Sequence, residues 1–350
     1  MKSRLVNPLI PIVTMLLTFC ALELAVRIFK QEFSFKNYLV EHINLFRSAY
    51  PVEHDAELGW IPKPGASGAE NVWGTEVTIR EHGVRSNGAT AMRNPALGDS
   101  APILAIGDSF TFGDEVSDHE TWPAQLESLL HRKVINAGVF GYGLDQSFLR
   151  AKKLLPIYKP GIVIFSFIVD DIYRCELSQR TGVSKPYFAV VEDSLWLQNT
   201  PVPPPALLDL GLGRKVFGYS LFVHKVMLRA FPDYWMHGLW VETRAHRGGE
   251  QVACLLMSRL QEIARLAAAD VLVLVQYSAD ESDENLQLAR RIIRCMDNAA
   301  IRVVDLRPAL DQMRAHDPEK YADIFNFLHM TNKGNYFIAE LLRQVIDGRH

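Results

Sequence analysis

The sequence predicts a doubly wound α/β fold with a mostly parallel sheet. Short apolar runs of strand length alternate with longer segments of helical periodicity from about residue 100 onward. The apolar runs lack the alternation of a half-exposed strand, so we expect each strand to be covered on both faces. Strands that alternate with helices favour parallel pairing through crossover helices. With 350 residues and 48% hydrophobic content, the chain can also bury a large core.

Five strands and five main helices account for this pattern. The strands are expected at residues 103–106, 134–136, 162–167, 271–276 and 302–305. The helices are expected at residues 122–130, 146–155, 251–268, 283–298 and 333–346. Ligands of such sheets bind beyond the carboxyl ends of the strands. Residues that directly follow a strand are therefore the first candidates for a functional site.

Ser109 is the candidate nucleophile. The first strand stops at Gly107, and Gly107-Asp108-Ser109 indicates a tight turn into a helix. A hydroxyl at this position would be exposed at the sheet edge and close to the N–H groups that open the helix, which favour developing negative charge. The alternative is that Asp108 and Ser109 only cap the helix, because these residue types are preferred caps whatever the function.

Three later segments support the catalytic interpretation. Gly138-Val139-Phe140-Gly141 follows the second strand, Asp170-Asp171 follows the third, and Asn326-Phe327-Leu328-His329 precedes the last helix. From Gly107 to the end, the set resembles the SGNH family, also called GDSL-type esterases. The resemblance implies a flavodoxin-like, three-layer α/β/α domain.

The same resemblance implies roles for individual residues. Ser109 would be the nucleophile and His329 the base, and the oxyanion hole would contain Ser109, Gly141 and Asp170. Asp170 stands where the family has an Asn, and Asn326 stands where it has the triad Asp. An Asn326 amide oxygen can still accept a hydrogen bond from the imidazole Nδ1–H.

Other carboxylates near these motifs have expected roles or alternatives. Asp323, one turn before Asn326, is an alternative source of charge for the imidazole. Asp170 could donate to an oxyanion if it were neutral in an apolar site. The alternative is that Asp170 turns away and caps the next turn. Asp108 and Asp171 are expected as possible substrate contacts.

The N-terminal residues 1–30 are expected to form a membrane anchor. An apolar run of about 18 to 20 residues follows Lys2 and Arg4, which is enough to cross a bilayer. A cleaved signal peptide and a buried core helix are the alternatives. No small-x-small cleavage site is evident, which favours an uncleaved, single-pass anchor. With a short N-terminal tail in the cytoplasm, the remaining chain would lie on the periplasmic side of an inner membrane.

Two further segments surround the catalytic domain, which is expected at residues 100–350. Residues 31–99 contain many Gly and Pro residues and short alternating runs, so they predict small strands and turns that pack on the core. We expect Trp60 and Arg85 to fasten this segment. An insertion at about residues 175–250 predicts a hairpin around Glu192-Asp193-Ser194 and an aromatic stretch, placed as a lid or as one wall of the cleft.

Composition excludes several classes of function. The formal net charge is −3 and no basic block is present, so nucleic acid is not an expected partner. The four cysteines show neither CxxC spacing nor a His-Cys cluster, and no metal or organic cofactor is expected. We expect these cysteines to be mostly free and buried, with room for one disulfide at most.

The expected function is that of an envelope serine esterase or O-acyltransferase. Its substrate would be a small ester or an acylated carbohydrate, with acetyl groups of an envelope polysaccharide as the first choice. Two alternatives remain open at this point. The first is a hydrolase of lipid esters or thioesters, suggested by the anchor and the aromatic insertion. The second is a catalytically impaired carbohydrate-binding protein, suggested by Asp170 and Asn326.

Overall fold

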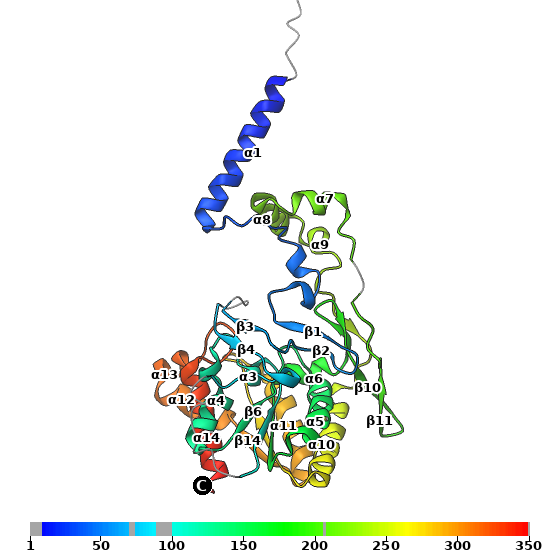
Figure 1. Cartoon of the computed structure of the whole chain (residues 1–350), viewed down its shortest axis with the longest axis vertical. Coiled ribbons are helices and arrows are strands. Elements are labelled where there is room, and N and C mark those ends of the chain that lie inside the picture. Colours follow the sequence, from blue (N-terminus) through cyan, green and yellow to red (C-terminus); the bar gives the residue numbers. More distant parts are fainter. Residues whose placement is uncertain (1–8, 70–73, 89–99, 206–207, 349–350) are drawn as a thin grey trace, which may run out of the picture.

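A five-stranded parallel sheet forms the centre of the α/β domain (Figure 1). The computed structural model describes residues 9–69, 74–88, 100–205 and 208–348. The strand order across the sheet is β6 (Val134–Asn136), β5 (Ile103–Ile106), β7 (Ile162–Phe167), β13 (Asp270–Val275) and β14 (Arg302–Asp305). In order of appearance this is 2-1-3-4-5, the flavodoxin-like arrangement. The predicted doubly wound fold is therefore confirmed, and four of the five strands have the predicted bounds.

Strand β7 lies at the middle of the sheet and is buried along its whole length. It pairs in parallel with β5 on one side and with β13 on the other, and Ile162 is in register with both Ile103 and Asp270. Because helices cover both faces, every residue of β5, β6 and β7 is buried. This explains why these strands are apolar or small without alternation.

Helices pack in two groups on opposite faces of the sheet (Figure 1). The first group contains α4 (Trp122–Leu130) and α14 (Asn332–Ile346), and the second contains α5 (Leu144–Tyr158), α10 (Gly249–Leu266) and α11 (Asp283–Asn298). The predicted bounds of α4 and α11 are confirmed, and the other three differ from the prediction by one to three residues at an end. Shorter helices are α3 (Ser109–Phe112), α6 (Val169–Arg174), α12 (Arg307–His316) and α13 (Pro318–Asp323).

Helix α1 (Leu9–Lys30) projects away from the rest of the chain (Figure 1). It has 22 residues and a mean hydropathy of 2.3 in its most apolar window, and none of that window is buried. Among the described residues it is the one helix long and apolar enough to cross a membrane. The basic residues Lys2 and Arg4, on which the predicted orientation depends, lie outside the described residues.

The segment after α1 packs on the α/β domain through a second apolar cluster. It contains the short strands β1 (Val52–Asp55), β2 (Gly59–Pro62), β3 (Ser67–Gly68) and β4 (Val77–Thr78), and the 3-10 turns at Val40–His42, Leu45–Arg47 and Glu81–Gly83. Trp60 is fully buried, and its Nε1 donates to the Phe140 carbonyl at 3.1 Å. Arg85 is buried and pairs with Asp118 at 2.9 Å. Both residues fasten the segment, as expected. The predicted boundary at residue 99 lies outside the described residues.

The insertion contains small sheets followed by helices. Its elements are β8 (Leu177–Arg180), β9 (Val183–Ser184), β10 (Tyr187–Val191), β11 (Ser194–Gln198), α7 (Gly211–Phe217), α8 (Leu221–Ala230), α9 (Pro232–Trp235) and β12 (Thr243–Arg244). Strands β10 and β11 form the predicted hairpin.

The cysteines differ from the prediction of mostly free thiols. Cys254 on α10 and Cys295 on α11 form a disulfide across the two packed helices. Cys20 is free and exposed on α1, and Cys175 is free and buried. The disulfide was not evident from spacing, because its partners are 41 residues apart on separate helices.

Candidate active site

The nucleophile turn is shaped by close backbone packing at the end of β5. A Cβ atom at Gly107 would lie 2.4 Å from the Thr111 Oγ1 and 2.7 Å from the Ser166 carbonyl oxygen, so no larger residue fits there. Asp108 caps α3, accepting from the Phe110 N–H at 3.0 Å. Ser109 is the first residue of α3 and is 6% exposed. The hydroxyl is therefore held rigidly at the helix N-terminus, as the sequence predicts.

The structure brings Ser109 and His329 together from positions 220 residues apart in the chain. The Ser109 Oγ lies 2.9 Å from the His329 Nε2. On the other side of the ring, Nδ1 lies 3.0 Å from an Oε1 atom of Glu115. A hydroxyl, an imidazole and a carboxylate in this order form the geometry of a catalytic triad. Glu115 was not among the residues selected from the sequence.

Asn326 does not occupy the position that the sequence predicts. It contacts His329 through the backbone, where its N–H donates to the His329 carbonyl at 2.7 Å. This bond closes the turn that carries the imidazole, while Glu115 occupies Nδ1. Asp323 is not the partner either, because its carboxylate pairs with Lys333. The prediction that Asn326 accepts a hydrogen bond from the imidazole is therefore wrong, because Asn326 lies on the turn that carries His329 and Glu115 contacts Nδ1.

Glu115 reaches the imidazole because the chain reverses sharply after α3. Gly113 ends the helix with φ +92°, and Glu115 itself has φ +71°. A left-handed conformation is uncommon for a residue with a side chain. In this conformation Glu115 faces the ring, with a side chain that is 9% exposed.

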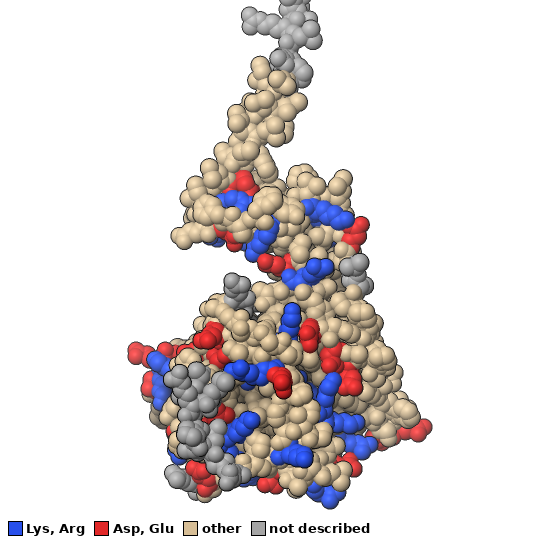
Figure 2. Space-filling view, viewed as in Figure 1, with Lys and Arg blue, Asp and Glu red and all other residues tan. Residues whose placement is uncertain are grey.

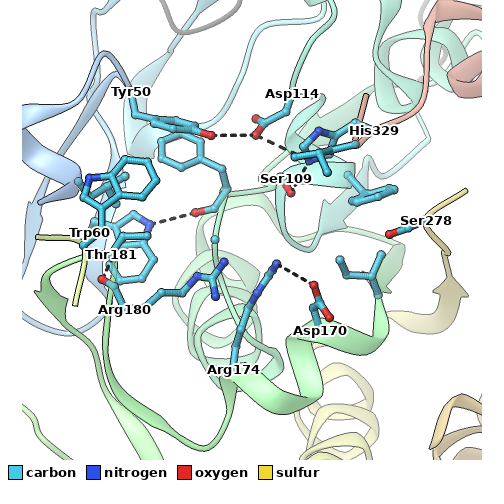
Figure 3. Close-up of a pocket in the computed structure, with 17 residues that line it drawn as sticks. Tyr50, Trp60, Ser109, Asp114, Asp170, Arg174, Arg180, Thr181, Ser278 and His329 are labelled. Atoms are coloured by element: carbon cyan, nitrogen blue, oxygen red, sulfur yellow. Dashed lines mark hydrogen bonds and ion pairs between the residues drawn. The ribbon is translucent and has the colours of Figure 1, made fainter. Parts of the chain in front are cut away.

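Asp114 is a second carboxyl group next to the imidazole. It is fully buried, its Oδ2 lies 3.9 Å from the His329 Nε2, and the Tyr50 hydroxyl donates to the same oxygen at 3.4 Å (Figure 3). Burial raises the Asp114 pKa to about 7, although the nearby His329 opposes the shift. Burial alone would lower the His329 pKa, but the hydrogen bond that its Nδ1–H donates to Glu115 and the charges of Asp114 and Asp108 raise the pKa above its ordinary value.

Backbone N–H groups are available on the other side of the hydroxyl. Gly141 follows β6 and lines the same cavity as Ser109, with φ +74°. Within the described part of the chain, neither the Ser109 nor the Gly141 N–H has a hydrogen-bond acceptor. Gly138 lets this loop approach α3, because a Cβ there would lie 2.2 Å from the Phe112 nitrogen. Two unoccupied donors near a nucleophile match the requirement of an oxyanion hole.

Asp170 lies at the rim of the site, not in an apolar environment. Its side chain is 61% exposed, and its Oδ2 lies 3.9 Å from the Arg174 Nη2, one turn later on α6. This position is not the apolar site that a donating role would require, so the idea of Asp170 as a hydrogen-bond donor is not supported. The group that presents N–H donors here is the Arg174 guanidinium.

Asp108 and Asp171 pair with Arg174 outside the lining of the cavity. The Arg174 Nη1 lies 3.3 Å from the Asp108 Oδ2 and also pairs with the Asp171 carboxylate. Both acids are buried, and burial together with the charge of Asp108 raises the Asp171 pKa well above its ordinary value. Neither acid lines the cavity, so they do not have the substrate-facing position that we expected. The same Asp108 oxygen lies 3.3 Å from the Ser109 Oγ, which places Arg174 next to the nucleophile.

A cavity of about 290 Å³ opens over the serine (Figure 3). Segments outside the central sheet supply much of its wall: Leu45, Tyr50 and Trp60 come from the N-terminal segment, and Arg180, Thr181 and Trp240 come from the insertion. The insertion therefore forms one wall of the cleft, as the sequence predicts. Burial and the nearby Arg174 lower the Arg180 pKa to about 10. Across the described ranges, no group of three or more His, Cys, Asp or Glu side chains could hold a metal ion.

No family model and no curated protein sequence matches this chain. Solved structures do resemble it. A lipolytic protein of the G-D-S-L family from Desulfitobacterium hafniense is 14% identical, with a TM-score of 0.40, and the match covers 70% of this chain and 99% of that chain. An acetylxylan esterase from Geobacillus stearothermophilus is 13% identical, with a TM-score of 0.40 and coverage of 71% and 96%.

A third similar structure is an esterase from a Pseudoalteromonas species. It is 12% identical, with a TM-score of 0.38 and coverage of 71% of this chain and 98% of that chain. The first of the three carries the same family name that the sequence motifs indicate. At these identities and TM-scores the likeness does not establish a function, which has to follow from the chemistry of the site.

Proposed function

We propose that the protein is a serine esterase or O-acyltransferase in which Ser109, His329 and Glu115 form the catalytic triad. The observation that carries this proposal is the chain of two contacts from the Ser109 Oγ to the His329 Nε2 at 2.9 Å and from Nδ1 to the Glu115 Oε1 at 3.0 Å. A serine hydroxyl becomes an effective nucleophile when an adjacent base takes its proton and a third group orients that base.

In the first half-reaction, the Ser109 Oγ attacks the ester carbonyl carbon while the His329 Nε2 takes the hydroxyl proton. The negative charge moves to the carbonyl oxygen, where the N–H groups of Ser109 and Gly141 would donate to it. The intermediate then collapses, the carbon–oxygen bond to the alcohol breaks, and the imidazolium returns the proton to the leaving oxygen. The product is an acyl group on Ser109.

In the second half-reaction, water or a sugar hydroxyl attacks the acyl carbonyl carbon while the His329 Nε2 takes its proton. The bond between the acyl carbon and the Ser109 Oγ then breaks, and the imidazolium returns the proton to Oγ, which releases the acid or the acylated sugar. Asp114 and Tyr50 lie beside Nε2 on the cavity side, so they would contact the incoming hydroxyl. Glu115 would keep the ring in the tautomer with its proton on Nδ1 and stabilise the imidazolium. Arg174 would provide a third, cationic donor near the oxyanion, in place of the Asn that the family carries at position 170.

The proposed substrate is a small O-acyl group, with acetyl as the first choice, on a carbohydrate of the cell envelope. A cavity of about 290 Å³ supports a short acyl chain, and the aromatic side chains of Tyr50 and Trp240 line it, as is common where sugar rings bind. The lipid ester and thioester alternative predicts a preference for longer acyl chains. The carbohydrate-binding alternative depended on Asp170 and Asn326. The Asn326 argument no longer supports it, because Glu115 provides a carboxylate at the His329 Nδ1.

The proposed location is the periplasmic side of an inner membrane, with α1 as a single-pass anchor. The exposed, apolar α1 supports an anchor, although a signal sequence passes the same test of length and composition. The Cys254–Cys295 disulfide supports an oxidising compartment, because disulfides persist outside the reducing cytosol.

A fluorophosphonate probe tests the proposed activity. We expect it to label the full-length wild-type protein and to leave Ser109→Ala unlabelled, with Ser128→Ala on the adjacent α4 as the matched control that keeps its label. Aryl esters of increasing chain length then separate acetyl from lipid substrates. The proposal would be refuted by a folded wild-type protein that neither reacts with the probe nor releases acetate from an aryl acetate.

A further inference from the structure

The helices of the insertion form a layer that is attached to the base of α1. We define this helical layer as α7, α8 and α9. It lies between α1 and the catalytic domain (Figure 1). A small core holds it together, formed by Trp235 of α9, by Leu210 and Leu239 directly flanking these helices, and by Leu39 of the segment after α1. The layer is thus a packed unit with its own apolar interior.

Glu23 and Arg27 of α1 hold the layer through specific hydrogen bonds. The Glu23 carboxylate accepts from the Ser220 hydroxyl at 2.7 Å and from the Leu221 and Phe222 N–H groups at 3.0 and 2.9 Å, so it caps the N-terminus of α8. Arg27 donates to the Tyr219 carbonyl at 3.1 Å. The charged residues of an otherwise apolar helix are therefore explained, and they fix the layer at the level where the apolar part of α1 ends.

The layer exposes large apolar side chains at this level. Their exposed fractions are 80% for Leu212, 53% for Phe217 and 60% for Phe231, and the linker after α1 adds 66% for Phe33 and 85% for Phe35. A monomeric protein in water seldom exposes so many large apolar residues in one region, because each costs free energy in contact with water. Such a surface indicates contact with something apolar.

A groove of about 560 Å³ lies between α1 and the layer. Its lining is mostly aromatic or aliphatic and includes Phe19 of α1, Phe33, Phe35, Val216 and Phe217. The groove is continuous with the exposed apolar surface of α1 through Phe19. Helix α1 is about 33 Å long at 1.5 Å per residue, close to the hydrocarbon thickness of a bilayer.

The charges of the layer also fit a lipid surface. Helices α7 and α8 carry Arg214, Lys215, Lys225 and Arg229 and no acidic residue. Helix α9 carries Asp233, and Lys215 pairs with Asp209, which precedes α7, so the balance of these charges is positive. In the described part of the chain, Lys225 and Arg229 form no ion pair. Figure 2 shows basic side chains beside the base of α1, directly below its uncharged stretch. Basic residues at this position attract anionic lipid headgroups.

We infer that the helical layer lies in the headgroup region of the bilayer that α1 crosses, and that lipid fills the groove between α1 and the layer. The inference does not depend on the chemistry of Ser109. It has a consequence for the site, because Trp240, which lines the cavity, is tied to the segment between α1 and the sheet. Its N–H donates to the His42 carbonyl at 3.0 Å, and its Nε1 donates to the Glu41 carbonyl at 3.3 Å. The bilayer would then fix the distance between the cavity and the membrane surface. The substrate would have to bring its acyl group close to that surface.

Spin labels on the full-length protein in nanodiscs of mixed zwitterionic and anionic phospholipid test this inference. Single cysteines would replace Leu212 and Phe217 in a Cys20→Ser background. Trp196, on the hairpin strand β11 far from α1, is the matched control because it is also a large exposed side chain, at 56%. The measured quantity is the collision rate of each label with oxygen, which concentrates in lipid, relative to a water-soluble nickel chelate.

We expect the oxygen-to-nickel ratio to be several-fold higher at Leu212 and Phe217 than at Trp196. Ratios equal to that at Trp196 would overturn the inference, because the layer would then lie in water. Labels shielded from both reagents, with dipolar broadening between copies, would also overturn it by identifying a second copy as the occupant. Unchanged thermal midpoints of the labelled variants confirm that each comparison is made on folded protein.

Discussion

Replacing Glu115 by Gln should cost most of the activity, whereas replacing Asn326 by Ala should cost little. The change Glu115→Gln keeps the size of the side chain and removes the charge 3.0 Å from the His329 Nδ1. In a serine protease the equivalent Asp to Asn change lowers kcat by about 10⁴-fold. Asp114 still places a carboxyl 3.9 Å from Nε2 here, so we expect a loss of about 10²- to 10⁴-fold. This loss corresponds to about 3 to 5 kcal/mol of transition-state stabilisation.

The assay is the pH dependence of kcat/KM with an aryl acetate. Catalysis requires neutral imidazole, so kcat/KM falls as pH drops through the His329 pKa, which the Glu115 hydrogen bond helps to raise. Glu115→Gln should therefore move the acidic limb to lower pH as well as lower the plateau. A loss in Asn326→Ala equal to or larger than that in Glu115→Gln would refute the assignment, provided that both variants keep the wild-type thermal midpoint.

Three other predictions concern stability. Burial raises the Asp114 pKa to about 7, so the contribution of the Asp114 carboxyl to the stability of the fold falls as pH rises from about 4 to 7. Asp114→Asn should therefore raise Tm more at pH 8 than at pH 5. Equal Tm shifts at both pH values would contradict this. Cys254→Ser removes the disulfide between two residues that are 41 apart in the chain, and loop-closure entropy predicts a loss of about 4 kcal/mol in the free energy of unfolding, measured with denaturant. Adding a reductant to the wild-type protein should cause the same loss. Gly138→Ala should lower Tm and distort the site, because the new Cβ would lie 2.2 Å from a backbone nitrogen of α3. Gly213→Ala is the control: its Cβ would have no atom closer than 3.8 Å, so Tm should stay nearly unchanged.

The central sheet could be predicted from local sequence because each of its strands has to satisfy a local condition. The residues of β5, β6 and β7 are apolar or small throughout, since both faces are covered, and turn residues end each run. The convergence of Ser109 and Gly141 at one edge follows from parallel pairing. Helices α12 and α13 and the helical layer were not predicted, because few of their side chains are buried and they leave a weaker apolar pattern in the sequence.

Glu115, the acid of the proposed triad, could not be predicted in the same way. Asn326 was selected by its distance from His329 along the chain, but its N–H bonds to the His329 carbonyl, and the Nδ1 of the ring contacts Glu115 instead. Glu115 is close to the nucleophile in sequence and reaches the base through a reversal at Gly113. A usable signal was present, since Asp114 and Glu115 are adjacent carboxylates directly after the glycine that ends the nucleophile helix. No periodicity in the sequence shows which of them faces the imidazole.

The disulfide and the capping of α8 by Glu23 are also beyond local sequence. Cys254 and Cys295 are far apart in the chain and meet because α10 packs on α11. Glu23 appears in the sequence as an interruption of an apolar run. Its three acceptor contacts with residues 220–222 exist because the insertion returns to α1, nearly 200 residues later.

The charges around Ser109 explain how an acid at position 170 is compatible with catalysis. The transition state of acyl transfer resembles an ion pair, with a positive imidazolium on one side of the serine and a negative oxyanion on the other. Glu115 and Asp114 lie beside the imidazole, and the Arg174 guanidinium lies on the far side of the hydroxyl, held by buried Asp108. The carboxylates beside the imidazole favour the imidazolium of the proposed mechanism, whereas the buried Asp108 and Asp171 offset much of the Arg174 charge, so Arg174 would act mainly as an N–H donor to the oxyanion. Asp170, at the exposed rim and 3.9 Å from Arg174, adds less negative potential at the oxyanion than a third buried carboxylate would, because solvent screens its charge.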